Sequence, residues 1–147
     1  MTDGYDTEAL TAIKRAVMEY GALYVSYTHV WGALDNNYIT FYWNGSESVY
    51  DSRGGGGHAV QIVGWDDTYD RKNFKYTPPG DGAFIVKNSW GNMNSIGGYN
   101  YVSYHDAKFA KGEIFSFQTV VPADAYTGVY EHDPIGRVSS LGLGSDT

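Results

Sequence analysis

Two apolar runs joined by a polar loop constrain the fold of this chain more than any other feature. The first run, GHAVQIVGW, begins with the last of four consecutive glycines and has His58 near its start. The second run, GAFIVKNSWG, has Asn88 near its end. Both runs are rich in β-branched and aromatic residues and are bounded by glycine or turn-forming residues, which is typical of β-strands. If they pair as an antiparallel hairpin, His58 and Asn88 meet at one edge of a sheet, beside a glycine-rich opening.

A histidine and an asparagine in contact can form a catalytic pair. A neutral imidazole can take a proton from a nucleophile and later return it to a leaving group. The side-chain carbonyl of asparagine can hold the other ring nitrogen in one tautomer without adding a charge. An indole such as Trp90 can cover that hydrogen bond, and Gly56 and Gly57 would let a substrate backbone approach closely. The alternative is structural, because a histidine at a strand start often packs and an asparagine at a strand end often forms a turn.

Together, GHAVQIVGW and FIVKNSWG closely resemble the motifs of papain-like cysteine peptidases. The resemblance covers roughly residues 6–120 and implies the β-rich, C-terminal half of that fold. It implies that His58 is the general base and acid, that Asn88 orients its ring, and that Trp90 shields their hydrogen bond. The implied reaction is peptide-bond hydrolysis on a peptide or protein substrate, with no metal and no organic cofactor.

The chain contains no cysteine. In papain-like peptidases the nucleophilic cysteine opens a helix in the N-terminal half of the domain. The resemblance therefore implies that residues 1–121 are the C-terminal half of a peptidase domain, inactive alone, whose partner is the missing half that carries the cysteine. Residues 122–147 are expected to be a tail or the start of a following module. A weaker resemblance to microbial surface proteins, in which a lectin-like module follows the papain-like domain, implies an extracellular or cell-surface location.

A function of another class stays open beside this one: a non-catalytic surface or glycan-binding module that keeps the papain-like scaffold. Self-association is a further expectation, because removal of the partner half would expose an apolar surface around His58 and Trp90. A symmetric dimer, or exchange of the 122–147 tail, would cover it. No charged-then-apolar leader follows Met1, so any export signal is expected upstream.

Charge and composition exclude several kinds of partner. The net charge of −7 disfavours nucleic acid and anionic membranes. No apolar run approaches the roughly 18 residues that a membrane helix needs. The lack of cysteine excludes disulfides and thiolate metal sites. The loop after the His58 strand is acidic but lacks the spacing of a calcium-binding loop, which favours a polar hairpin connection; its carboxylates are Asp66, Asp67, Asp70 and Asp81.

The remaining pattern predicts an α+β fold, in which an N-terminal helix packs on an antiparallel, β-barrel-like sheet of five or six strands. Asp6 predicts the start of the helix and Gly21 its end. One apolar stripe lies between them, made of Leu10, Ile13, Val17 and Tyr20. Further strands are predicted at residues 22–30, 99–104 and 114–121, with a weaker one at 126–130. The aromatic connection 31–57 either lines a substrate cleft or covers the sheet, and His29 is assigned to structure.

Overall fold

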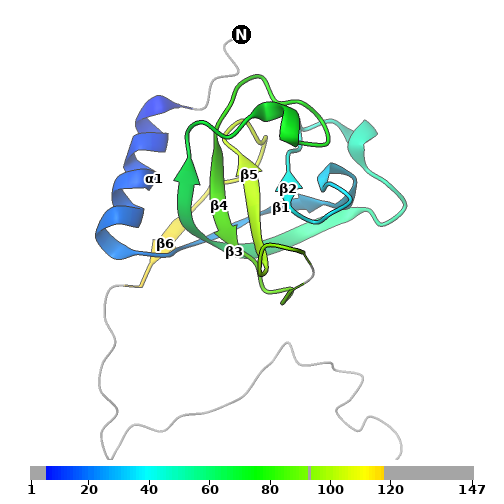
Figure 1. The fold of residues 1–147 in the computed structure, drawn as a ribbon. Coiled ribbons are helices and arrows are strands. Elements are labelled where there is room, and N and C mark those ends of the chain that lie inside the picture. The colour runs from blue at the N-terminus through cyan, green and yellow to red at the C-terminus, as the bar shows by residue number, and fades with distance from the viewer. Residues whose placement is uncertain (1–5, 93, 118–147) are drawn as a thin grey trace, which may run out of the picture.

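The computed structural model describes residues 6–92 and 94–117. These residues form one α-helix and six strands: α1 (Thr7–Tyr20), β1 (Leu23–Val30), β2 (Thr40–Phe41), β3 (Gly55–Asp66), β4 (Ala83–Lys87), β5 (Tyr99–Ser103) and β6 (Ile114–Ser116). The strands make one sheet in the order β2-β5-β4-β3-β1-β6 (Figure 1). The α+β class and the N-terminal helix agree with the prediction, and five of the six strands lie at predicted positions, whereas β2 lies in the predicted connection 31–57. The predicted strand at 126–130 and the segment 122–147 lie outside the described residues.

Helix α1 begins and ends where its sequence predicts. The Asp6 side chain accepts a hydrogen bond from the backbone N–H of Glu8 at 2.9 Å, which caps the first turn. Gly21 ends the helix with a φ of 83°, a value that glycine adopts without strain. Ile13 is buried against the sheet, whereas Tyr20, in the last turn, is 41% exposed. The apolar stripe therefore packs over its first three turns and leaves the sheet at Tyr20.

The sheet is mostly antiparallel, as predicted, but it is open where a barrel-like form was expected. Its edge strands, β2 and β6, do not pair with each other, and β2 runs parallel to β5. All other strand pairs are antiparallel. A closed barrel needs long edge strands that can pair, but β2 has only two residues. The chain around β2 instead forms two short 3₁₀ helices, η1 (Trp31–Ala33) and η2 (Glu47–Val49).

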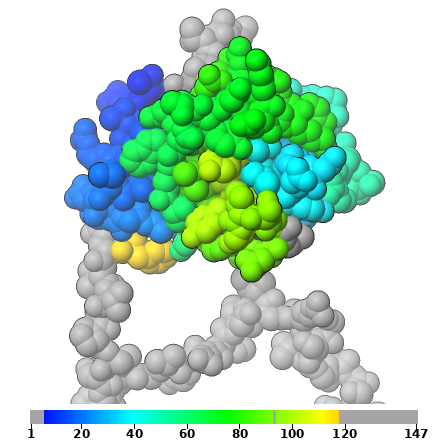
Figure 2. Space-filling view, viewed as in Figure 1, coloured from blue at the N-terminus to red at the C-terminus, as the bar shows by residue number. Residues whose placement is uncertain are grey.

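The aromatic connection 31–57 covers the sheet with its central residues and lines a groove with its two ends. Its central residues Phe41, Tyr42 and Trp43 are buried and cover the sheet. Its two ends, Trp31 and Gly55–Gly57, lie beside His58 instead. Figure 2 shows this connection (cyan) and α1 (blue) on opposite flanks of the molecule, with the loop after β3 (green) across the top.

A buried carboxylate ties the connection to the turn after β5. Asp106, 1% exposed, accepts hydrogen bonds from the backbone N–H groups of Trp43 at 2.8 Å, Lys108 at 2.9 Å and Phe109 at 2.7 Å. Burial raises the pKa of Asp106 to about 6, and these three donors act in the opposite direction. The Asp106 side chain thus joins residue 43 to residues 106–109, where no strand pairing connects these segments.

Among the described residues, no helix is both long and apolar enough to cross a lipid bilayer.

Candidate active site

The register of the β3–β4 hairpin brings His58 and Asn88 together. Gln61 on β3 lies opposite Lys87 on β4, so Asn88, the next residue, falls beside the part of β3 that leads back to His58. His58 Nε2 and Asn88 Oδ1 are 3.0 Å apart. The predicted contact is confirmed, since hydrogen bonds of this kind span about 2.7–3.2 Å.

A chain of hydrogen bonds that starts at a backbone carbonyl fixes which atom donates in this contact. Asn100 donates from Nδ2 to the Tyr38 carbonyl oxygen, which can only accept. Asn100 Oδ1 therefore accepts from Asn88 Nδ2, 3.0 Å away. Asn88 Oδ1 accepts from the Ser89 backbone N–H at 2.8 Å and, by the same orientation, from His58. Nε2 of His58 thus carries the proton, and Nδ1 is left to accept one.

Sequence reasoning did not find Asn100 or Tyr38. The alternation of YNYVSY offered a signal for Asn100, because it places this amide on the same face as the apolar Val102. A polar side chain there needs a buried partner, and Asn100 is 4% exposed. Tyr38 offered no such signal, since it lies outside any strand with a positive φ of 59°.

Two indole rings stack in succession on the His58 imidazole. The Trp90 ring lies nearly parallel to the His58 ring, with centroids 4.8 Å apart and planes at 20°. Trp31 stacks on Trp90 at 5.1 Å and 14°. The Arg53 guanidinium lies 5.4 Å from the Trp31 ring centre. The contact predicted between Trp90 and His58 is confirmed, and the structure extends it into a ring stack, defined here as His58, Trp90 and Trp31.

His29, which its sequence assigns to structure, packs beside this site. It is 4% exposed, and its ring centre lies 5.7 Å from that of His58. Nδ1 is 3.0 Å from the Tyr27 hydroxyl, whereas Nε2 has no hydrogen-bond partner within the described part of the chain. Burial lowers the pKa of His29 to about 4, and the nearby charges of His58 and Arg53 act in the same direction. His29 is therefore neutral at neutral pH.

We expect the stability of the fold to depend on pH in opposite directions through His29 and through Asp106. The lowered pKa of His29, about 4, means that stability is lost as pH falls from about 6.5 towards 4, because the unfolded chain binds the proton first. The raised pKa of Asp106, about 6, means that stability is lost as pH rises from about 4 to 6. Each effect amounts to roughly 3 kcal/mol over its full pH range. Urea unfolding at pH 4.5 and 7 should therefore show that Asp106→Asn loses more stability on acidification than the unchanged protein; equal losses would contradict this.

A groove of about 290 Å³ opens beside the imidazole, lined by His29, Trp31, Arg53, Gly55, Gly56, Gly57, His58 and Trp90. The two glycines proposed for the substrate cleft, Gly56 and Gly57, are thus neighbours of His58. A Cβ at either would meet no atom within 4 Å, so packing within the chain does not require glycine there. Gly55 differs, because its Cβ would lie 2.6 Å from the His29 carbonyl oxygen.

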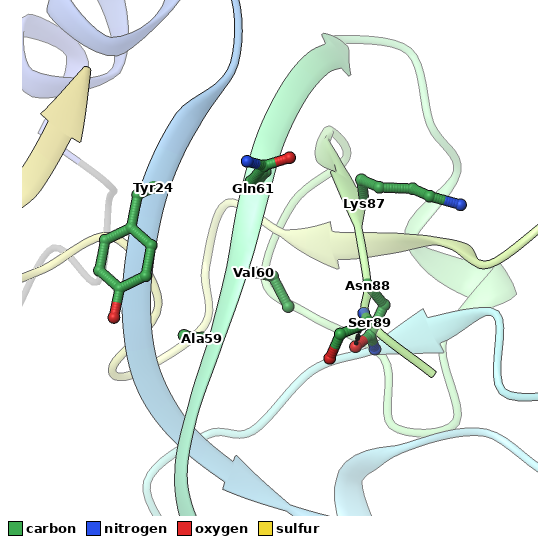
Figure 3. A pocket seen from close by; sticks show the side chains of 7 residues that line it. All are labelled: Tyr24, Ala59, Val60, Gln61, Lys87, Asn88 and Ser89. Atoms are coloured by element: carbon green, nitrogen blue, oxygen red, sulfur yellow. Dashed lines mark hydrogen bonds between the residues drawn. The ribbon is translucent and has the colours of Figure 1, made fainter. Parts of the chain in front are cut away.

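A smaller pocket of about 170 Å³ lies between β3 and the end of β4 (Figure 3). It is lined by Tyr24, Ala59, Val60, Gln61, Lys87, Asn88 and Ser89. Tyr24 on β1 lies opposite both Gln61 on β3 and Phe115 on β6, so these three side chains share one face of the sheet. Phe115 is 50% exposed there, and its ring centre is 6.1 Å from that of Tyr24.

The acidic loop after β3 uses its carboxylates for local hydrogen bonds. Asp66 and Asp70 accept from backbone N–H groups two residues further on, and Asp81 accepts from the Arg71 N–H. Asp67 binds the Lys14 ammonium and the Tyr104 hydroxyl. No group of three or more acidic, histidine or cysteine side chains suited to a metal occurs within residues 6–92 and 94–117.

Comparison with known proteins gives the family. The model of the papain family cysteine proteases matches residues 3–117. No curated protein sequence matches the chain. Among solved structures, a cysteine-to-alanine variant of the clostridial cysteine protease Cwp84 after propeptide cleavage is 31% identical, with a TM-score of 0.66 over 78% of this chain. A structure of the cysteine protease and lectin-like domains of Cwp84, a surface layer associated protein of Clostridium difficile, is 30% identical, with a TM-score of 0.67 over 76%.

This chain spans 27% and 24% of the lengths of those two proteins. The family match nevertheless covers most of the chain, including both strands of the β3–β4 hairpin. The chain therefore belongs to the papain family of cysteine proteases.

Proposed function

We propose that this chain is the histidine- and asparagine-bearing half of a papain-like peptidase and hydrolyses peptide bonds together with a half that supplies the cysteine. The observation that carries the proposal is the 3.0 Å contact between His58 Nε2 and Asn88 Oδ1, with Trp90 stacked on the imidazole. A scaffold that binds glycans or other surface ligands without catalysis would have no need of an imidazole held in one tautomer.

The chemistry follows from that tautomer. Because Nε2–H donates to Asn88, His58 Nδ1 can take the proton of a cysteine thiol, and the thiolate then attacks the substrate carbonyl. The same nitrogen returns the proton to the leaving amine, so the amine half of the substrate departs from beside the imidazole. Asn88 keeps the ring oriented through both transfers, and it adds no charge that would compete with the thiolate.

The face shared by Tyr24, Gln61 and Phe115 is the proposed contact surface for the cysteine-bearing half. This face adjoins the pocket that Asn88 lines. It exposes large apolar side chains that a partner would bury, since Phe115 is 50% and Phe117 73% exposed. Without that half, a second copy of this chain would cover the same face. A location at the cell surface is proposed by analogy with the surface layer associated Cwp84.

We expect the isolated chain to cleave no peptide, because it contains no cysteine to form a covalent intermediate. Co-expression with the cysteine-bearing half of the parent protein should restore hydrolysis of a fluorogenic peptide library. A matched sample in which that cysteine is replaced by alanine is the control. Hydrolysis by the pure chain, abolished by His58→Ala, would show that the nucleophile lies within it. A parent that lacks the cysteine, or never cleaves, would favour a non-catalytic module.

A further inference from the structure

We propose that Trp31 is a positioning residue that holds Trp90 over the catalytic imidazole. The inference rests on the proposed function, since it concerns the same imidazole. Trp31 makes the stacking contact with Trp90, whose own ring stacks on His58. It thus acts on the imidazole only through another side chain.

Trp90 needs such a support because its own backbone supplies little. It lies after the end of β4, in the segment that connects β4 to β5, whose described residues 88–92 and 94–98 form no strand or helix. Two hydrogen bonds join the ends of this segment. The Asn88 N–H donates to the Gly98 carbonyl at 3.0 Å, and the Gly98 N–H donates to the Asn94 side chain at 3.0 Å. These contacts hold the two ends of the connection, and they leave the orientation of the Trp90 indole to its side-chain neighbours.

Trp31 has contacts outside the β4–β5 connection on both its backbone and its ring. Its N–H donates to the Gly54 carbonyl at 3.2 Å, and its carbonyl accepts from the Leu34 N–H at 3.2 Å and from Arg53 Nη2 at 3.3 Å. The Arg53 guanidinium also lies over its ring at 5.4 Å. Trp31 therefore joins Trp90 to the start of η1 and to the segment that leads into β3.

His29 sets the angle of the whole stack. Its ring stands at 71° to His58, 86° to Trp90 and 83° to Trp31, with centroid distances of 5.7, 5.1 and 4.8 Å. A buried ring in contact with all three members of the ring stack blocks their rotation. Its Nε2 finds no hydrogen-bond partner among the described residues, which is the arrangement expected when a ring edge meets aromatic faces.

The consequence for catalysis is exclusion of water from one hydrogen bond. A hydrogen bond strengthens when its surroundings are less polar, so an indole held flat against His58 strengthens the bond to Asn88. If Trp31 is lost, Trp90 can tilt, water reaches Nε2–H, and the imidazole samples orientations in which Nδ1 no longer faces the thiol.

The first experiment uses the chain itself and NMR of the ring nitrogens of His58. In Trp31→Leu, the exchange of Nε2–H with water should accelerate by about tenfold. Trp31→Phe keeps an aromatic face and should restore slow exchange. The matched control is Trp65→Leu, because Trp65 is also a half-buried indole packed on the core with a cation, Lys14, 5.7 Å from its ring centre. Equal exchange rates in folded Trp31→Leu and Trp65→Leu would overturn the inference.

If Trp31→Leu does not fold, the same exchange rate is measured in Arg53→Gln. The Arg53 side chain is 48% exposed, so its loss leaves no cavity in the core. Acceleration of the exchange supports the inference, and no change overturns it. The second experiment measures kcat/KM in the complete peptidase, where Trp31→Leu should cost about tenfold, mostly in kcat. A complete protein that cleaves nothing would refute the proposed function, whereas an active one that is indifferent to Trp31→Leu would refute only the role of Trp31.

Discussion

Replacing His58 with alanine in the complete peptidase is expected to lower kcat/KM by about 10⁴-fold. The substitution removes the group that takes the thiol proton and returns it to the leaving amine, and within residues 6–92 and 94–117 no other imidazole lies where it could do the same. His29 is the nearest alternative, but it is buried, and burial lowers its pKa to about 4, so it is a weak base. The measurement is hydrolysis of a fluorogenic peptide, with the folded state of each variant checked by circular dichroism.

Two companion variants make this result specific. Asn88→Ala leaves His58 Nε2–H without its acceptor and should cost about 10²-fold, because the general base remains but is poorly oriented. His105→Ala is the matched control: it follows β5 at the end where Ser103 pairs with Ala83, opposite the end where Tyr99 pairs with Lys87 beside Asn88. Its activity should stay within about twofold of the unchanged enzyme. Retention of activity in His58→Ala would remove this imidazole from the mechanism.

Replacing Asp106 with alanine should lower the free energy of unfolding by about 4 kcal/mol. The carboxylate is the acceptor for three backbone N–H groups, and alanine would leave all three without it in a region that water hardly reaches. Residue 43 would also lose one of its links to residues 106–109, whereas the hydrogen bond from the Ala107 N–H to the Trp43 carbonyl would remain. Urea unfolding at pH 7 measures the loss.

Asp106→Asn separates the loss of acceptors from the loss of charge. The asparagine carbonyl can still accept from Lys108 and Phe109, as Asp106 Oδ1 does, so about half of the stability should be recovered. Asn37→Ala, at an exposed position, is the control and should change stability by less than about 0.5 kcal/mol. If Asp106→Ala costs no more than this control, the three hydrogen bonds do not stabilise the fold.

The hairpin and its polar pair could be derived from sequence because both depend only on residues within the two strands and the loop between them. Side chains alternate along a strand, and an antiparallel hairpin places the start of one strand beside the end of the other. Once His58 and Asn88 were assigned to those positions, their contact followed without knowledge of any other strand. Helix α1 was equally readable, since Asp6 and Gly21 act within one turn of its ends.

Other features required the strand order, which no local pattern encodes. Asn100 meets Asn88 because β5 is the neighbour of β4, and Tyr38 reaches Asn100 because β2 lies beyond β5. The open form of the sheet has the same reason: the edges β2 and β6 do not meet, and whether they meet depends on how the whole sheet is assembled.

The sequence by itself thus determined which residues form the hairpin, the polar pair at its edge and the indole above it. The tertiary structure decided what holds that pair in place. Asn100 and Tyr38 orient the amide, while His29 and Trp31 enclose the rings. These residues come from segments far apart in the chain, and a contact between distant segments exists only after the sheet has set their distance and angle.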